Sequence, residues 1–269
     1  MTNSLQLANP ISRSAAQDRP GVDVLLNVTV PVLNEAQCIA ANVKRLAAFL
    51  GGLSGITFEI VIADNGSTDE TLALAEKLAA ELACVRVLHL EEKGRGRALK
   101  AAWQGSQAAI LSYMDADLST DLSVLPQMLA ILQAGEYDLA VASRLLQPVS
   151  TKRGLKREFI SRIYAGIVKH LFRTKFSDPQ CGFKVMRRAV LENLLPFVKD
   201  EGWFFDTELL VLAERNNWRI VDVPAPWRER KESRVQLLPT MAADLKGLLS
   251  LYRRLRRPSV PKTETCAPH

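Results

Sequence analysis

The chain has 269 residues, of which 48% are hydrophobic, and a mean hydropathy of +0.01, so it can bury a large core as one α/β domain or as two small ones. Four cysteines without a Cys-x-x-Cys spacing and three scattered histidines predict neither a disulfide framework nor a zinc site. The net charge is +6, and because no uncharged apolar run reaches about 18 residues, we expect no membrane-spanning helix.

The N-terminal half alternates β-branched apolar runs with helical patterns. The first helix carries Ile39, Val43, Leu46 and Leu50 at helical spacing and stops at two glycines, and residues 67–70 form a capping box before the second. This alternation predicts a mostly parallel sheet with helices on both faces, whose ligands bind beyond the carboxyl ends of the strands. We predict strands at 25–30, 58–63, 85–88 and 110–114, and a third helix at 98–109.

The alternation breaks after a fifth predicted strand at 139–143. Beyond it the sequence predicts a helix at 159–172, another helix from Phe205 and a short strand at 219–223. The last predicted helix, 241–257, is amphipathic and basic, so it either lies in an anionic membrane surface or packs on the body. Its apolar face consists of Met241, Leu245, Leu248, Leu249 and Tyr252.

Two carboxylates, Asp115 and Asp117, directly follow the fourth predicted strand. Successive side chains of an extended backbone alternate faces, so we expect Asp115 and Asp117 to point the same way. Two hard oxygen ligands at the end of a buried strand suit Mg²⁺ or Mn²⁺ with positions left open for phosphate oxygens. The alternative for Asp-x-Asp alone is a turn or a helix cap.

Two further loops carry polar groups at strand ends. Asp64 and Asn65 follow the second strand, where the ring N–H of a base can donate to Asp64, although both residues are also common in turns. Arg95 lies between two glycines after the third strand. Because Leu99 stands where a third glycine would be needed, this loop is not a dinucleotide fingerprint, and it offers a cation to a diphosphate or base instead.

A basic block covers residues 144–188. It holds twelve Lys or Arg against the acidic residues Glu158 and Asp178. Such an excess attracts phosphates of nucleic acid, lipid headgroups or a phosphorylated substrate, and a solvated helix face is the alternative.

The ordered motifs together resemble glycosyltransferase family 2. Residues 31–35, 63–69, 94–96 and 114–117 each follow a predicted strand in the family's order. Further segments, at 143–144, 156–157, 178–184, 205–210 and 223–233, are similar to the polyprenyl-phosphate branch, particularly the dolichyl-phosphate glucosyltransferases. The resemblance implies a GT-A fold, with a Rossmann-like, mostly parallel sheet and a C-terminal amphipathic helix, and it covers residues 27 to 245.

The resemblance also implies roles for individual residues. Asp115 and Asp117 are expected to hold the metal, and Asp206 to contact sugar hydroxyls or act as a base, with helix capping as its alternative. The expected nucleotide-binding residues are Pro31, Asn34, Glu35, Asp64, Asn65, Arg95, Asp115 and Ala116. The expected acceptor-binding residues are Arg144, Arg157, Arg230 and Ser233, and the expected catalytic residues are Asp117, Arg144, Arg157, Asp206 and Arg230.

The expected reaction is inverting transfer of a hexose, with glucose favoured, from a nucleotide-diphosphate sugar to a polyprenyl (dolichyl or undecaprenyl) phosphate. UDP-glucose is favoured as donor over GDP-mannose, and the expected location is the cytoplasmic face of an anionic membrane, without nucleic acid. Two alternatives stay open: another acceptor, such as a diacylglycerol, glycolipid or polysaccharide, and a non-catalytic nucleotide- or nucleic-acid-binding protein. The expected segments are a disordered 1–23, a nucleotide half 24–118, an acceptor half 119–238, the helix 239–257 and a disordered tail 258–269.

Overall fold

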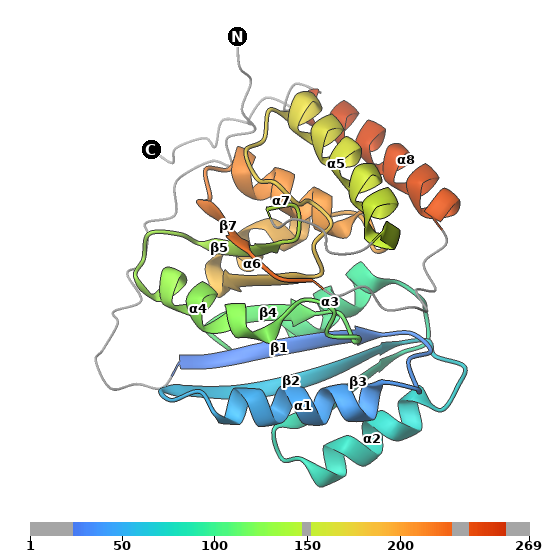
Figure 1. Ribbon diagram of the computed structural model, residues 1–269, viewed down its shortest axis with the longest axis vertical. Helices are drawn as coiled ribbons and strands as arrows, with labels where there is room; N and C mark the ends of the chain where they lie inside the picture. The colour runs from blue at the N-terminus through green and yellow to red at the C-terminus, as the bar shows by residue number, and fades with distance from the viewer. Residues whose placement is uncertain (1–23, 147–151, 228–236, 257–269) are drawn as a thin grey trace, which may run out of the picture.

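The computed structural model describes residues 24–146, 152–227 and 237–256, so the two predicted disordered ends lie outside the described residues. In this part of the chain seven strands form one sheet in the order β3-β2-β1-β4-β6-β5-β7 (Figure 1). The strands are β1 Val24–Val32, β2 Ile56–Asn65, β3 Val85–Leu90, β4 Ile110–Met114, β5 Leu139–Ser143, β6 Phe183–Arg187 and β7 Ile220–Pro224. The α-helices are α1 Ile39–Gly51, α2 Thr71–Glu81, α3 Arg95–Gln104, α4 Leu125–Gln133, α5 Lys152–Phe172, α6 Arg188–Leu194, α7 Phe205–Arg215 and α8 Leu237–Arg256. Two short 3₁₀ helices cover Leu122–Val124 and Leu195–Phe197.

The sheet is mostly parallel, which confirms the predicted α/β class. Strands β1 to β4 pair in parallel, and β5 pairs in parallel with β7. Strand β6 is inserted antiparallel between β4 and β5, and the sequence did not predict it. Its insertion brings the segment before Phe183 to the carboxyl end of β4.

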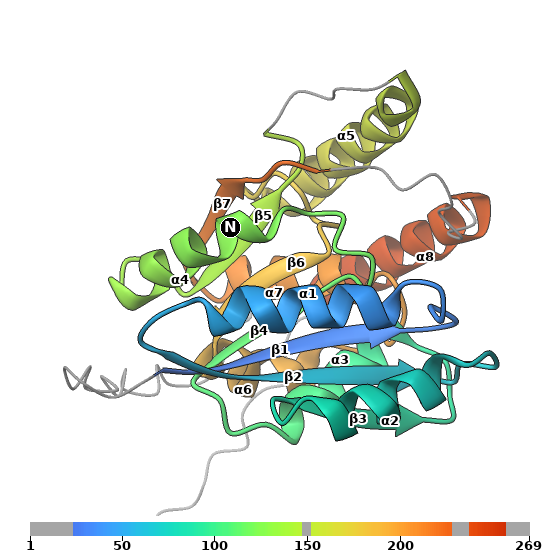
Figure 2. The ribbon, with the colours of Figure 1, turned by 60° about the horizontal axis from the view of Figure 1, so that its bottom comes forward.

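Helices cover both faces of the sheet, as predicted. On β2, Ile60 and Ile62 belong to the main core together with α1, whereas Val61 and Ala63 pack with Ala98 of α3. This is the alternation expected of a strand that is buried on both sides. Figure 2 shows α1 in front of the strands and α3 behind them.

Several predicted helix limits differ from the structure: α3, α5 and α8 begin at Arg95, Lys152 and Leu237 and not at the predicted 98, 159 and 241. Helix α3 ends at Gln104 rather than at 109, because Gly105 caps it and the chain then turns into β4. Helix α2 starts at Thr71 without the predicted capping box. The Ser67 hydroxyl instead accepts a hydrogen bond from the Asn34 N–H, and the Asp69 carboxylate accepts from the Thr71 N–H at 3.0 Å.

Helix α8 packs on the body of the domain, which is one of the two alternatives predicted for the last helix. The rings of Phe172 on α5 and Tyr252 on α8 have centroids 6.4 Å apart. Gly247 lies so close to Phe204, the residue before α7, that a Cβ there would overlap the ring. Residues Leu248, Leu251 and Leu255 complete this buried face.

The predicted single apolar face of the last helix is in fact two faces. Leu248 is buried, whereas Met241, Leu245 and Leu249 form an exposed stripe at i, i+4 and i+8. Helix α5 carries a matching exposed stripe of Phe159, Ile163 and Ile167, in which Phe159 is 65% exposed. Within the described residues, no helix is long and apolar enough to cross a membrane.

Candidate active site

The aspartate pair follows β4 at the carboxyl edge of the sheet, as predicted. Its backbone is not extended, however, because the Leu118 N–H donates to the Asp115 carbonyl and Leu118 has a φ of 48°. The extended backbone assumed in the prediction is therefore wrong, and a turn sets the positions of the two carboxylates. Asp117 accepts a hydrogen bond from the Ser119 N–H at 3.0 Å.

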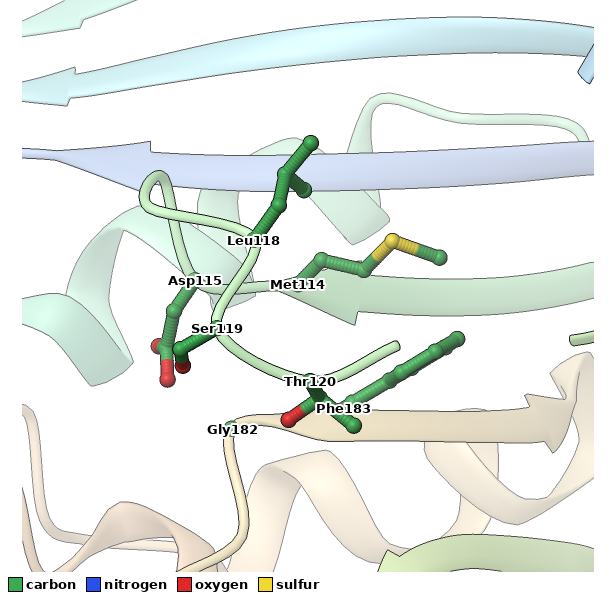
Figure 3. Close-up of a pocket in the computed structure, with 7 residues that line it drawn as sticks. All are labelled: Met114, Asp115, Leu118, Ser119, Thr120, Gly182 and Phe183. Atoms are coloured by element: carbon green, nitrogen blue, oxygen red, sulfur yellow. The ribbon is translucent and has the colours of Figure 1, made fainter. Parts of the chain in front are cut away.

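Gly182 makes room for the Asp115 carboxylate. A Cβ built on Gly182 would overlap the carboxylate, and the Asp115 N–H donates to the Gly182 carbonyl at 3.2 Å. The two residues line a small pocket that also includes Ser119 and Phe183 (Figure 3). In Figure 3 the Asp115 and Ser119 side chains extend from the loop in the same direction. Glycine is thus required at position 182 by the position of the acid.

Arg95 bridges the two halves of the site. One guanidinium nitrogen donates to Asp115 at 2.7 Å, and another forms an ion pair with Asp206 at the start of α7. The guanidinium also lies over the rings of Tyr113 and Trp203, 5.0 and 5.1 Å from their centroids. Such a cation, fixed by two carboxylates and two rings, holds Asp115 on the site side of the sheet.

Asp206 is enclosed by hydrogen-bond donors. Besides Arg95, its carboxylate accepts from the Tyr113 hydroxyl and from Lys184 Nζ at 2.8 Å. Lys184 is 0% exposed and also donates to the Tyr113 hydroxyl at 2.8 Å and to the Cys181 carbonyl. The buried cluster of Arg95, Tyr113, Lys184 and Asp206 is called the charged cluster below. Sequence reasoning missed Lys184, although it lies in the quoted segment 178–184.

Burial shifts both ends of this cluster toward neutral charge states. It raises the pKa of Asp206 to about 6, against the opposing effect of Arg95, and it lowers the pKa of Lys184 to about 7. The helix-capping alternative for Asp206 is wrong, because its carboxylate binds side chains of other elements and Phe204 is the N-cap of α7. Its direct contact with sugar stays a prediction, and its observed contacts are those of a positioning residue.

Asn34 joins the loops after β1 and β2. Its strained backbone has a φ of 58°, its N–H donates to the Ser67 hydroxyl at 2.9 Å, and its side-chain oxygen accepts from the Thr68 N–H at 2.7 Å. The Glu35 N–H donates to the Thr71 hydroxyl at 2.8 Å, and Pro31 pairs in register with residue 63 of β2. These contacts gather the predicted nucleotide-binding residues at one edge of the sheet.

Asn65 and Ala116 also tie loops together. The Asn65 amide donates to the Val32 carbonyl at 2.6 Å, and its oxygen accepts from the Gly94 N–H at 3.2 Å. The Ala116 carbonyl accepts from the Asn42 amide at 2.8 Å. Both residues therefore fix the loops at this edge, and their contact with a nucleotide stays a prediction.

On the acceptor side, Arg144 forms a paired interaction with Asp178. Its guanidinium donates to the two carboxylate oxygens at 2.8 and 2.9 Å. Burial disfavours the charged form of Arg144, but Asp178 more than offsets this and raises the pKa of Arg144 above its usual value. Arg230 and Ser233 lie outside the described residues, and at Arg157 only the helical backbone of α5 is described, so the predicted acceptor cluster stays a prediction.

The residues at the aspartate pair fit a divalent cation. Asp115 has a 41% exposed side chain and Asp117 is part-buried, and both are hard oxygen donors. Asp115 already binds one cationic group, the Arg95 guanidinium, so this position favours positive charge. In the described part of the chain no group of three or more His, Cys, Asp or Glu could hold a metal ion.

The chain is similar to known glycosyltransferases. The family model described as "Glycosyl transferase family 2" matches residues 27–195. Glycosyltransferase AglD of Haloferax volcanii is 37% identical over 228 residues, which are 84% of this chain but 36% of AglD, so the chain spans about a third of that protein. The dolichyl-phosphate beta-glucosyltransferase of Drosophila melanogaster is 30% identical, over 79% of this chain and 69% of the fly protein.

A solved structure shares the fold. It is glucosyl-3-phosphoglycerate synthase from Mycobacterium tuberculosis in complex with Mn²⁺, uridine-diphosphate and glucosyl-3-phosphoglycerate. Its TM-score is 0.62 at 20% identity, with 88% of this chain and 81% of that chain covered. The GT-A fold is confirmed, and so is the resemblance to the polyprenyl-phosphate branch. Because the family model matches well over half of this chain, the chain belongs to glycosyltransferase family 2.

Proposed function

We propose that the enzyme transfers glucose, with inversion, from UDP-glucose to a polyprenyl phosphate at the cytoplasmic face of a membrane. The observation that supports binding of the donor is the part-exposed Asp115 carboxylate, which Arg95 holds at the carboxyl edge of the sheet. The acceptor is supported by the similarity to the fly protein named dolichyl-phosphate beta-glucosyltransferase. GDP-mannose is the alternative donor.

The proposed reaction is a direct displacement. An oxygen of the acceptor phosphate forms a bond to the anomeric carbon, the bond from that carbon to the diphosphate breaks, and its electron pair leaves with UDP. Because the acceptor oxygen is already anionic near neutral pH, no strong general base is needed. The fully enclosed position of Asp206 accords with this, since its carboxylate holds Arg95 and Lys184.

Charge compensation is the main requirement of this reaction. Mg²⁺ or Mn²⁺ held by Asp115 and Asp117 would offset the negative charge that develops on the diphosphate. Arg95 supplies a fixed positive charge 2.7 Å from Asp115, and Arg144 supplies another on the acceptor side. Arg157 and Arg230 complete the proposed set for the acceptor phosphate.

The exposed stripes of α5 and α8 support a membrane surface as the meeting place with the acceptor. Each helix shows three large apolar side chains at i, i+4 and i+8. The two helices are also basic, since their sequences contain Lys152, Arg153, Lys156, Arg157, Arg162, Lys169, Lys246, Arg253, Arg254 and Arg256 against Glu158 and Asp244. Apolar side chains flanked by Lys and Arg suit an anionic lipid surface.

A donor screen tests the proposed reaction. The protein is incubated with UDP and GDP sugars, Mg²⁺ or Mn²⁺ and a polyprenyl phosphate, and the product is identified by mass. We expect a polyprenyl-phosphate glucose that disappears in Asp115→Asn and Asp117→Asn. The matched control is Glu76→Gln, an exposed carboxyl on α2. Product from another lipid acceptor alone, or undiminished product in the Asp variants, would contradict the proposal.

Vesicle flotation tests the membrane surface separately. We expect the protein to float with vesicles that contain anionic lipid, and the double variant Ile163→Glu/Leu245→Glu to stay in the soluble fraction. Phe197→Glu is the control, because Phe197 is 45% exposed but lies outside α5 and α8. Equal flotation of the double variant and the control would refute the surface while leaving the transfer reaction in place.

A further inference from the structure

Asp64 and His89 form a pair at the carboxyl edge of the sheet. They are register partners on the neighbouring parallel strands β2 and β3, so the backbone places their side chains on the same face. His89 Nδ1 lies 2.7 Å from Asp64 Oδ2. An ionised carboxylate only accepts hydrogen bonds, so the His89 tautomer that donates to it carries its proton on Nδ1.

The second oxygen of Asp64 has no partner among the described residues. Asp64 is 0% exposed, and its Oδ1 is buried without a hydrogen bond. Buried carboxylate oxygens are nearly always satisfied, so an unsatisfied one at a ligand-binding edge points to a donor supplied by a ligand. The neighbouring Asn65 does not compete for that donor, because Val32 and Gly94 already occupy its amide.

We infer that His89 is a positioning residue for recognition of the donor base, and this inference rests on the proposed function. By holding Oδ2, it fixes the rotation of the Asp64 carboxylate and leaves Oδ1 to accept from a ring N–H. Uracil offers such a group at N3 and guanine at N1, whereas N3 of cytosine carries no hydrogen. The pair therefore selects a base that has a ring N–H.

Variants at position 89 separate positioning from folding. His89→Ala removes the donor, whereas His89→Asn keeps one, because the Asn amide nitrogen occupies nearly the place of Nδ1. The His89 side chain is 41% exposed, so neither change opens a core cavity. Arg86→Ala is the matched control, since it removes another contact between β2 and β3, the 3.3 Å ion pair with Glu59.

Calorimetry with UDP and CDP, together with transfer kinetics, provides the readout. We expect His89→Ala to raise the Kd for UDP about tenfold, the effect of losing one orienting hydrogen bond, with kcat and the Kd for CDP nearly unchanged. His89→Asn should bind UDP within about twofold of the wild type. Arg86→Ala should match the wild type for both nucleotides.

The possible failures are distinguishable. Wild-type affinity in His89→Ala, or equal weakening in His89→Ala and Arg86→Ala, would overturn the positioning role and leave the proposed donor untouched. Failure of His89→Asn to restore UDP binding would also overturn it. Equal affinity of the wild type for UDP and CDP would overturn base reading by Asp64, and with it both the inference and the uridine donor.

Discussion

Two regions at the same edge of the sheet hold their polar groups in different ways. Where β1 and β2 end, neutral groups such as Asn34 and Ser67 bond to backbone N–H groups of nearby loops. Between β4, β6 and α7, the charged cluster joins Arg95, Lys184 and Asp206 in the interior. Losing one hydrogen-bond partner in the first region costs little unfolding free energy. Removing one partner in the second leaves a buried charge unpaired, which costs more.

This difference separates the two tasks of the site. Neutral hydrogen bonds between loops set the shape of the edge where the donor nucleotide is proposed to bind. The charged cluster sets the position of Asp115 through Arg95, and so governs the carboxylates next to the diphosphate. We therefore expect substitutions in the charged cluster to alter stability and activity together, and substitution of a neutral loop group such as Ser67 to act mainly through a small loss of stability.

The largest effect is expected for Lys184→Met. The change leaves the Asp206 carboxylate buried with one cation fewer, and removing one partner of a buried pair costs about 3–5 kcal/mol of unfolding free energy. Urea unfolding at pH 7 measures the loss. The control is Lys77→Met on the exposed face of α2, which should be near neutral. A loss for Lys184→Met as small as that of the control would show that Asp206 does not depend on Lys184.

Gly182→Ala should have the next largest effect. The new methyl group would occupy the space of the Asp115 carboxylate and displace it from Arg95. We expect transfer activity to fall about a hundredfold, which is typical of a displaced group in an active site. Gly166→Ala on α5 serves as control, because nothing lies within 4 Å of its added Cβ. Retained activity would mean that Asp115 works from another position.

A pH-dependent effect is expected at Asp244 of α8. Burial, with repulsion from Asp200 and Asp206, raises its pKa from 3.8 to about 7, so the folded state keeps a proton that the unfolded chain has lost. This contribution to stability is complete below pH 3.8 and disappears as the pH rises through about 7.

Asp244→Asn should remove this fall. At pH 8 the variant is expected to be more stable than the wild type by roughly 2 kcal/mol, and the Gln180 amide keeps an oxygen to which it can donate. Urea unfolding from pH 4 to 8 gives the comparison, with Glu76→Gln as the exposed control. Parallel pH profiles for wild type and Asp244→Asn would contradict the prediction.

The smallest effect is expected in the neutral region. Ser67→Ala removes the acceptor of the Asn34 N–H and should cost about 1 kcal/mol of unfolding free energy. Urea unfolding again measures it, with the exposed Ser54→Ala as control. A loss as large as that of Lys184→Met would abolish the contrast between the two regions.

The sequence predicted the edge of the sheet better than it predicted the interior. Asp64, Arg95 and Asp115 were placed together because the carboxyl ends of parallel strands meet at one edge. The local geometry was less accessible. The turn at Leu118 needs a positive φ that leucine rarely adopts, so local preference argues against it. The hydrogen bond from the Asn34 N–H to the Ser67 hydroxyl joins segments 33 residues apart, and no local pattern reveals it.

The charged cluster could not be read from spacing. Lys184 and Asp206 are 22 residues apart, and their meeting depends on β6 entering the sheet antiparallel. A buried lysine in a strand has the same sequence signature as an exposed one. The same limit applied to α8, where the apolar pattern indicated one face, although packing on α5 and α7 divides it into a buried and an exposed one.

The antiparallel direction of β6 also has a consequence for how the site can change. The loops that follow the parallel strands lie at this edge of the sheet. Because β6 is antiparallel, the segment that precedes it lies there instead, and this segment includes Gly182 beside Asp115. The segment between α5 and β6 can therefore change at positions other than Gly182 without altering any strand on the proposed donor side. Changes on the proposed acceptor side and on the proposed donor side would in this way fall in different stretches of one chain.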